Sequence, residues 1–155
     1  GPENGRNWVY GDCYPAVGMI ETPCAEAGAE AELSLYCGEN HWQGLGTDVY
    51  RYTLRRDGFA SLSAGSRTRV LTTKPLIFTG DTLLLNFSTS ARGSLYAVIT
   101  DADGRSLESG ELFGDRTDRP VDFGGRLCDF AEKPVTLRFT MTECDLFSMQ
   151  FRASV

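Results

Sequence analysis

The stretch EAELSLYC, residues 30–37, alternates between two kinds of side chain. Ala31, Leu33, Leu35 and Cys37 are apolar or small, while the intervening positions carry Glu, Ser and Tyr. An alternation with a period of two is typical of a β-strand with one buried face, because successive side chains of a strand point to opposite faces. The chain from Ala31 onward is therefore predicted to form strands rather than helices.

The same kind of pattern recurs along the rest of the chain. Residues 49–54 alternate in the same way, and Asp57-Gly58 then supplies a dipeptide favoured in tight hairpin turns, with residues 59–64 as the returning strand. Further strand-like runs lie at residues 69–72, 76–79, 83–88, 95–100, 135–141 and 146–152. Short strands at this spacing predict an all-β protein, a two-sheet antiparallel β-sandwich of the jelly-roll-like kind.

Two stretches lack this alternation. Residues 1–29 combine aromatic residues and prolines with little periodicity, so we expect them to cover the sheet rather than to form strands. We interpret residues 1–46 as an N-terminal covering segment packed on or joined to a sandwich of residues 47–155. Residues 102–134 are rich in Gly, Asp and Arg and are expected to wrap one end or one open edge of the sandwich. Within them, the mixed charges of residues 114–119 predict a solvated loop, with a calcium or sugar-hydroxyl site there as the less favoured alternative.

Length and charge exclude some partners. The chain has 155 residues, which corresponds to one domain or to one domain plus a fragment of another. With 21 Asp+Glu, 15 Lys+Arg and a net charge of -6, it has no broad electrostatic attraction to nucleic acid or to anionic lipid. The apolar runs are also far shorter than the roughly 18 residues of a spanning helix. We expect no nucleic-acid and no membrane partner.

The cysteines do not form a metal-binding or redox motif. The sequence contains five of them and no CxxC pair, so the expectation is buried free thiols, with Cys37 and Cys144 as small hydrophobic residues in strand-like runs. A disulfide between Cys13 and Cys24 is the alternative. His41 is the only histidine, which excludes a site built on several imidazoles.

Residues 101–104, DADG, resemble the start of a calcium-binding loop. The further oxygen ligands and the closing Glu of an EF-hand are missing at the required offsets. Asp103-Gly104 therefore predicts a hairpin turn. No cofactor is expected; calcium stays open, without a motif that supports it.

The most suggestive local cluster is residues 39–44, ENHWQG, a glycine-bounded loop after a strand. The indole of Trp42 is suited to stacking on the apolar face of a sugar ring, and Glu39, Asn40, His41 and Gln43 are candidates for hydrogen bonds to its hydroxyl groups. The alternative is that Trp42 covers the end of the core.

Other aromatic residues could extend such a platform. Trp8, Tyr10 and Tyr14 are the candidates, although a segment that packs on the sheet is the favoured explanation for them. Glycoside hydrolysis needs two carboxylates, and the first third of the chain contains several. With 21 acidic residues many pairs arise by chance, so no catalytic residue is predicted.

Several longer motifs support a comparison with a known family. The runs RYTLRRDGFAS at 51–61, TKPL at 73–76, LLLN at 83–86 and GSLYAVITDADG at 93–104 follow one another along the chain. LFGD, KPVTLRF and DLFSMQF continue the series at residues 112–115, 133–139 and 145–151. Over roughly residues 47–152 the chain resembles the C-terminal β-sandwich of bacterial proteins related to glycoside hydrolases with a five-bladed β-propeller, the grouping that includes glycoside hydrolase family 32.

The resemblance carries functional expectations. Residues 11–22 and 32–36 are similar to the last propeller region that precedes such a sandwich, while the blades that would carry catalytic carboxylates are not in this chain. The resemblance implies a non-catalytic accessory module with an upstream catalytic domain in the same polypeptide as its partner. Together with the aromatic loop, it predicts a carbohydrate-binding module whose other partner is a poly- or oligosaccharide. A secreted or cell-surface location is favoured for such a module. The alternatives are a structural or oligomerisation sandwich supporting the propeller and, third, an autonomous glycosidase.

Overall fold

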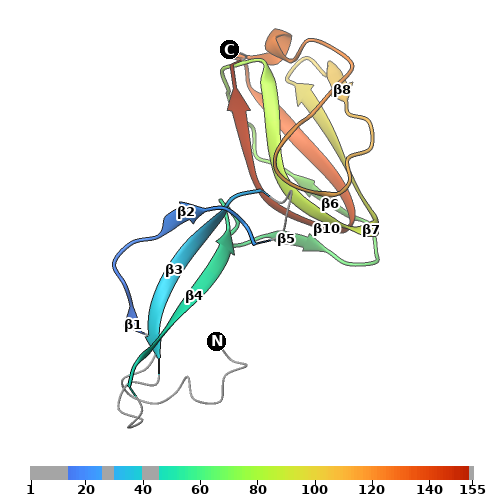
Figure 1. Ribbon diagram of the computed structural model, residues 1–155. Helices are drawn as coiled ribbons and strands as arrows, with labels where there is room; N and C mark the ends of the chain where they lie inside the picture. The colour runs from blue at the N-terminus through green and yellow to red at the C-terminus, as the bar shows by residue number, and fades with distance from the viewer. Residues whose placement is uncertain (1–13, 26–29, 40–45, 154–155) are drawn as a thin grey trace. The chain divides into compact units, whose positions relative to one another are not determined.

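A computed structural model describes residues 14–25, 30–39 and 46–153. Its regular elements are antiparallel strands and a short 3-10 turn, η1 (Leu127–Phe130), which confirms the all-β prediction. The chain divides into two compact units, unit 1 (Gly1–Arg56) and unit 2 (Asp57–Val155), and each contains one of the two sheets (Figure 1). The described part contains no helix long and apolar enough to cross a membrane.

Unit 1 is a sheet organised around β3 (Glu32–Glu39). β3 pairs along its whole length with β4 (Asp48–Arg55) and, nearer its two ends, with β1 (Tyr14–Pro15) and β2 (Ile20–Thr22). The expectation that residues 1–29 contribute no strands is therefore wrong for β1 and β2, which are too short to show an alternation and form by pairing with β3. Because β4 pairs with β3, the compact units divide after Arg56 rather than at residue 46.

Unit 2 is built on a long antiparallel ribbon of two strands, β7 (Thr82–Asp101) and β10 (Val135–Arg152). Each contains two of the runs that the sequence predicts as separate strands. Both strands are irregular at mid-length, where the register passes from Ser94–Thr142 to Thr89–Cys144. Gly93 is required there, because a Cβ atom at this position would lie 2.3 Å from the carbonyl oxygen of Glu143.

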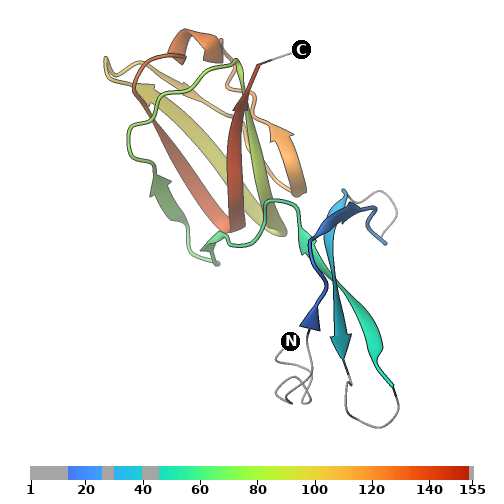
Figure 2. The same cartoon turned by 90° about the vertical axis from the view of Figure 1, so that its left-hand side faces the viewer.

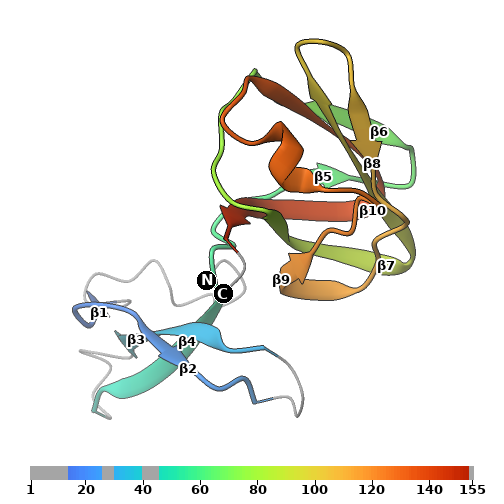
Figure 3. The ribbon, with the colours of Figure 1, turned by 90° about the horizontal axis from the view of Figure 1, so that it is seen from above.

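The remaining strands of unit 2 divide between the two halves of this ribbon. Residues 82–89 of β7 pair with β9 (Asp115–Pro120) and with the end of β10, which also pairs with β5 (Leu62–Ala64). Residues 94–101 pair with β8 (Ser106–Glu108) and with the start of β10, which also pairs with β6 (Arg69–Thr72). Figures 2 and 3 show unit 2 from two further sides.

Both halves of the ribbon contribute side chains to one core. Phe87 comes from the first half of β7 and Ile99 from the second, and Phe139 and Leu146 come from the two halves of β10. Figure 3 shows the two sets of strands facing each other. The predicted two-layer antiparallel sandwich is confirmed, while the jelly-roll assignment stays a prediction.

Three local predictions differ from the structure. Asp57 lies in a turn with a positive φ of 52°, but this turn does not close a hairpin, because β4 pairs with β3 and β5 pairs with β10. Residues 114–119 are not a loop, because most of them form β9 on the edge of β7. The run 76–79 contributes only an isolated bridge between Leu76 and Val135.

The predicted turn at Asp103-Gly104 is confirmed and joins β7 to β8. The buried carboxylate of Asp101 accepts hydrogen bonds from the backbone N–H groups of Asp103 and Arg105 and from the Arg105 guanidinium, at 2.7 Å from Nε. Burial of Asp101 favours its neutral form, but the hydrogen bonds and charge of Arg105 outweigh this, so the pKa of Asp101 is lowered. The oxygens of Asp101 thus stabilise the turn.

Cys24, Cys37, Cys128 and Cys144 carry free thiols. Cys37 and Cys144 are buried, as predicted, whereas Cys128 is exposed on η1. Burial, aided by the charge of Asp145, raises the pKa of the Cys144 thiol to about 11, so this group stays protonated at neutral pH. Cys13 lies outside the described residues.

Candidate functional site

Most of the predicted sugar-binding residues lie outside the described part of the chain. These are Trp8, Tyr10, Asn40, His41, Trp42 and Gln43. The structure describes the other two, Tyr14 and Glu39, and both belong to the sheet of unit 1.

Tyr14 and Glu39 lie near the same end of β3 but not on the same face. Tyr14 is exposed and pairs with Gly38, the neighbour of Glu39. Because successive residues of a strand face opposite sides, the Tyr14 ring and the Glu39 carboxylate point to opposite faces of the sheet. Glu39 is buried and accepts a hydrogen bond from the Tyr52 hydroxyl. The structure therefore does not unite these two residues in one platform.

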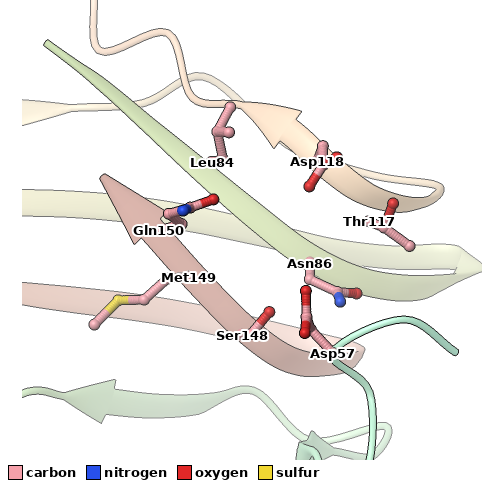
Figure 4. Close-up of a pocket in the computed structure, with 8 residues that line it drawn as sticks. All are labelled: Asp57, Leu84, Asn86, Thr117, Asp118, Ser148, Met149 and Gln150. Carbon is pink, nitrogen blue, oxygen red and sulfur yellow. The ribbon is translucent and has the colours of Figure 1, made fainter. Parts of the chain in front are cut away.

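Unit 2 contains a polar pocket that the sequence analysis did not predict. Its volume is about 310 Å³, near the lower end of the range for small-molecule sites. We call it the β7–β10 pocket, and Figure 4 shows its lining, which consists of Asp57, Leu84, Asn86, Thr117, Asp118, Ser148, Met149 and Gln150. A pocket of this size is suited to one small unit of a ligand, such as a single sugar ring.

The alternation of β7 explains how its floor forms. Leu83, Leu85 and Phe87 face the core and are fully buried, so Leu84 and Asn86 point to the outer face of the sheet. On the neighbouring strand β10, Gln150 lies opposite Leu84 and Ser148 lies opposite Asn86. These four outward residues are brought together by the antiparallel register of the ribbon.

An irregularity in β9 supplies the second side of the pocket. The pairing of β9 with β7 shifts register between Leu85 and Phe87, opposite the segment that contains Thr117 and Asp118. Such a bulge re-aims side chains relative to a regular strand. Figure 4 shows Asn86 lying between Asp57 and these two β9 residues. The pocket is thus formed where β9, β7 and β10 lie next to one another.

The pocket has a buried floor and an exposed rim. Asn86 and Leu84 are 2% and 9% exposed, whereas Asp57, Asp118 and Gln150 are exposed. The amide and hydroxyl side chains of the lining can both donate and accept hydrogen bonds, while each carboxylate accepts hydrogen bonds with its two oxygen atoms. The lining contains no Lys, Arg or His. This set of groups is suited to a ligand rich in hydroxyl or other hydrogen-bond donors.

The pocket does not resemble a metal centre. No group of three or more His, Cys, Asp or Glu able to hold an ion occurs among the residues that the structure describes. Two carboxylates belong to the pocket, fewer than high-affinity calcium sites commonly supply.

The sequence carried a partial signal for this pocket. Asn86 interrupts the apolar run 83–87, and Ser148 and Gln150 alternate with larger apolar residues, so all three are expected to face outward. Their meeting depends on the pairing of β7 with β10, which no local pattern specifies. Thr117 and Asp118 belong to the run 114–119, where a sugar-hydroxyl site is only the alternative because the mixed charges favour a loop.

Comparison with family models, curated proteins and solved structures found no match to this chain.

Proposed function

We propose that this chain is a non-catalytic, carbohydrate-binding accessory module of a glycan-active protein. The observation that carries the proposal is the β7–β10 pocket, whose hydroxyl, amide and carboxylate groups are those that bind sugar hydroxyls. The resemblance of residues 47–152 to sandwiches that accompany glycoside hydrolases supports the same function. The upstream catalytic domain and the saccharide are the proposed partners.

The pocket replaces the aromatic loop as the main element of the proposal. Residues 40–43 lie outside the described part of the chain, and Trp42 stays a proposed stacking group. The pocket can instead bind through hydrogen bonds at a buried floor, where competition from water is reduced. The two elements belong to different units, so each can be tested alone.

The test is a glycan array followed by titration of the best ligand. Gln150→Ala and Ser148→Ala each remove pocket hydrogen bonds and are expected to weaken binding about 5-fold to 20-fold, since a lost hydrogen bond in a binding site costs about 1–2 kcal/mol. Thr72→Ala, an exposed change on β6 in the other layer, is the control and should leave affinity unchanged.

Trp42→Ala tests the aromatic loop in the same assay. A loss of binding with Trp42→Ala alone would assign the site to the loop, and no retained glycan for the wild type would contradict the proposed function.

Release of reducing sugar should be measured in parallel. We expect none, because the proposal gives the pocket carboxylates a binding role only. Release that disappears in Asp57→Asn or Asp118→Asn would show instead that this chain hydrolyses glycosides.

A specific observation favours a second function, that of a structural module supporting a catalytic domain. Among the described residues of unit 1, Tyr14, Ile20, Val49 and Tyr50 are apolar or aromatic and exposed. Exposed side chains of this kind commonly mark an interaction surface. Binding of the isolated catalytic domain to this chain, with no glycan retained, would favour this function over carbohydrate binding.

A further inference from the structure

The eight residues that line the β7–β10 pocket carry charge of one sign only. Asp57 and Asp118 contribute two carboxylates, and no lining residue is cationic. The other polar groups are uncharged amides and hydroxyls. A ligand with an anionic substituent would therefore meet like charges at the rim, while a cationic substituent would meet opposite ones.

The arginines near the pocket do not change this sign. Arg116 lies opposite Phe87 and Arg119 opposite Leu85, two core-facing residues, so the register puts both arginines on the other face of the sheet from Asn86. Arg152 shares the outer face of β10 with Gln150 but does not line the pocket.

We propose that the β7–β10 pocket selects sugars with a free amino group over their hydroxyl and N-acetyl counterparts. This inference rests on the proposed carbohydrate-binding function and names its ligand class. The ammonium group donates three hydrogen bonds to the carboxylates of Asp57 or Asp118, while the neighbouring hydroxyls of the sugar bond to Asn86, Ser148 and Gln150.

The proposal does not require an unpaired carboxylate. Asp118 already takes part in another contact, but a carboxylate has about four lone-pair sites and can accept further hydrogen bonds. A simple aliphatic amine is a poorer match, because Leu84 and Met149 are the only apolar side chains in the lining. In Figure 4 the side chain of Met149 points away from the other lining side chains.

The experiment compares oligosaccharides that share linkage and length and differ only in the substituent at carbon 2. Oligomers of glucosamine, N-acetylglucosamine and glucose form one series, and the galacto-configured equivalents form a second. Titration calorimetry of the whole chain is done at mildly acidic pH, where the sugar amine is protonated. In at least one series we expect the amino form to bind about 10-fold more tightly, which corresponds to about 1.4 kcal/mol.

Two variants with the same net charge separate pocket contacts from long-range attraction. Asp57→Asn combined with Asp118→Asn keeps the shape of the pocket, and Asn tolerates the positive φ at position 57. This variant should lose the preference for the amine while still binding the hydroxyl form. Glu108→Gln combined with Glu132→Gln removes two exposed carboxylates elsewhere and should keep the preference.

The outcomes separate the inference from the proposed function. If neutral glycans bind through Gln150 but the amino forms bind no more tightly in either series, the inference fails and the function stands. A preference that survives in the double Asn variant also overturns the inference. If no glycan on the array is retained, both fail. A requirement for Ca²⁺, seen as binding lost in EDTA, would show that the carboxylates hold a cation instead of the amine.

Discussion

The two units of this protein are both antiparallel sheets, yet they bury very different side chains. Every member of the large apolar core belongs to unit 2, where two layers close over residues such as Leu85, Phe87 and Phe139. Within the described part of unit 1, the buried residues are Ser34, Cys37 and Glu39. Hydrophobic burial therefore stabilises unit 2, whereas hydrogen bonds and ion pairs carry more of the stability of unit 1.

The polar network of unit 1 illustrates this difference. The Arg51 guanidinium donates to Ser34 Oγ at 2.8 Å and to Thr22 Oγ1 at 3.0 Å, and it forms an ion pair with Glu32 at 2.5 Å. One side chain thus connects β2, β3 and β4. The described residues of unit 1 form a single sheet with few buried side chains, so such cross-strand contacts supply part of the stabilisation that the apolar core supplies in unit 2.

The largest effect is expected from the core of unit 2. Phe139 is 1% exposed and belongs to β10, at a position that pairs with β6 on one side and with β7 on the other. Phe139→Ala should destabilise unit 2 by about 3–5 kcal/mol, because it removes buried surface and leaves a cavity. The loss of stability is measured by urea unfolding, monitored through the hydrogen exchange of peptides from unit 2.

The control for the core variant lies in unit 1. Val49→Ala changes a side chain that is 72% exposed and should cost less than about 1 kcal/mol, the full span of strand propensity. Equal losses for the two variants would contradict the comparison, since they would mean that unit 1 has a core as important as that of unit 2.

An intermediate effect is expected in unit 1. Arg51→Met keeps the length and apolar stem of the side chain but removes its hydrogen bonds and ion pair, and it should cost about 1 kcal/mol, since the guanidinium is partly exposed. Hydrogen exchange of peptides from β2 to β4 is the measurement.

Arg51→Lys sharpens this prediction. A lysine can still pair with Glu32 but cannot bridge three groups in the fixed geometry of a guanidinium. We expect it to recover only part of the lost protection. Full recovery would show that charge alone, rather than the bridging geometry, stabilises unit 1.

The smallest effect, and the one that depends on pH, is expected at the β7–β8 turn of unit 2. The pKa of Asp101 is lowered in the folded state, so its contribution is present above the unfolded pKa near 3.8 and is lost as the pH falls through the folded pKa. Asp101→Asn should therefore be less stable than the wild type at neutral pH, and the difference should shrink at pH values below 3.8.

Denaturant midpoints of both proteins across this range measure the effect, with Asp103→Asn, in the same turn, as the control. A difference that does not change with pH would assign the role of Asp101 to its shape and hydrogen bonds rather than to its charge.

The sequence predicted strands well wherever one face is buried. The runs around Leu85, Ile99 and Leu137 lie in strands whose apolar face is buried, as the alternation predicts. The run around Leu35 also lies in a strand, but there Ser34 of the predicted polar face is fully buried while Leu33 and Leu35 are half-buried. The sequence-based prediction failed where a strand forms only because it pairs with a neighbouring strand. β1 and β2 form on the edge of β3, β9 forms on the edge of β7, and the turn at Asp57 leads from one sheet to the other.

The candidate site also combines features that local alternation predicts with features that depend on strand pairing. The outward orientation of Asn86, Ser148 and Gln150 could be predicted from alternation, but their grouping could not. The predicted aromatic loop at residues 39–44 rests on local composition alone. Its described member, Glu39, accepts a hydrogen bond from the Tyr52 hydroxyl within unit 1, and no local pattern in the sequence indicated this contact.

By itself, the sequence determined the fold class, the buried faces of the long strands of unit 2 and the lack of a metal-binding motif. These properties depend on the order of apolar and polar residues over short distances. Tertiary structure alone decided that two pairs of predicted strands are continuous, that the register of their ribbon shifts where Gly93 approaches Glu143 and that β9 adds Asp118 to the outer face. Pairing and register join residues far apart in the chain, so the pocket exists only once the sheet has formed.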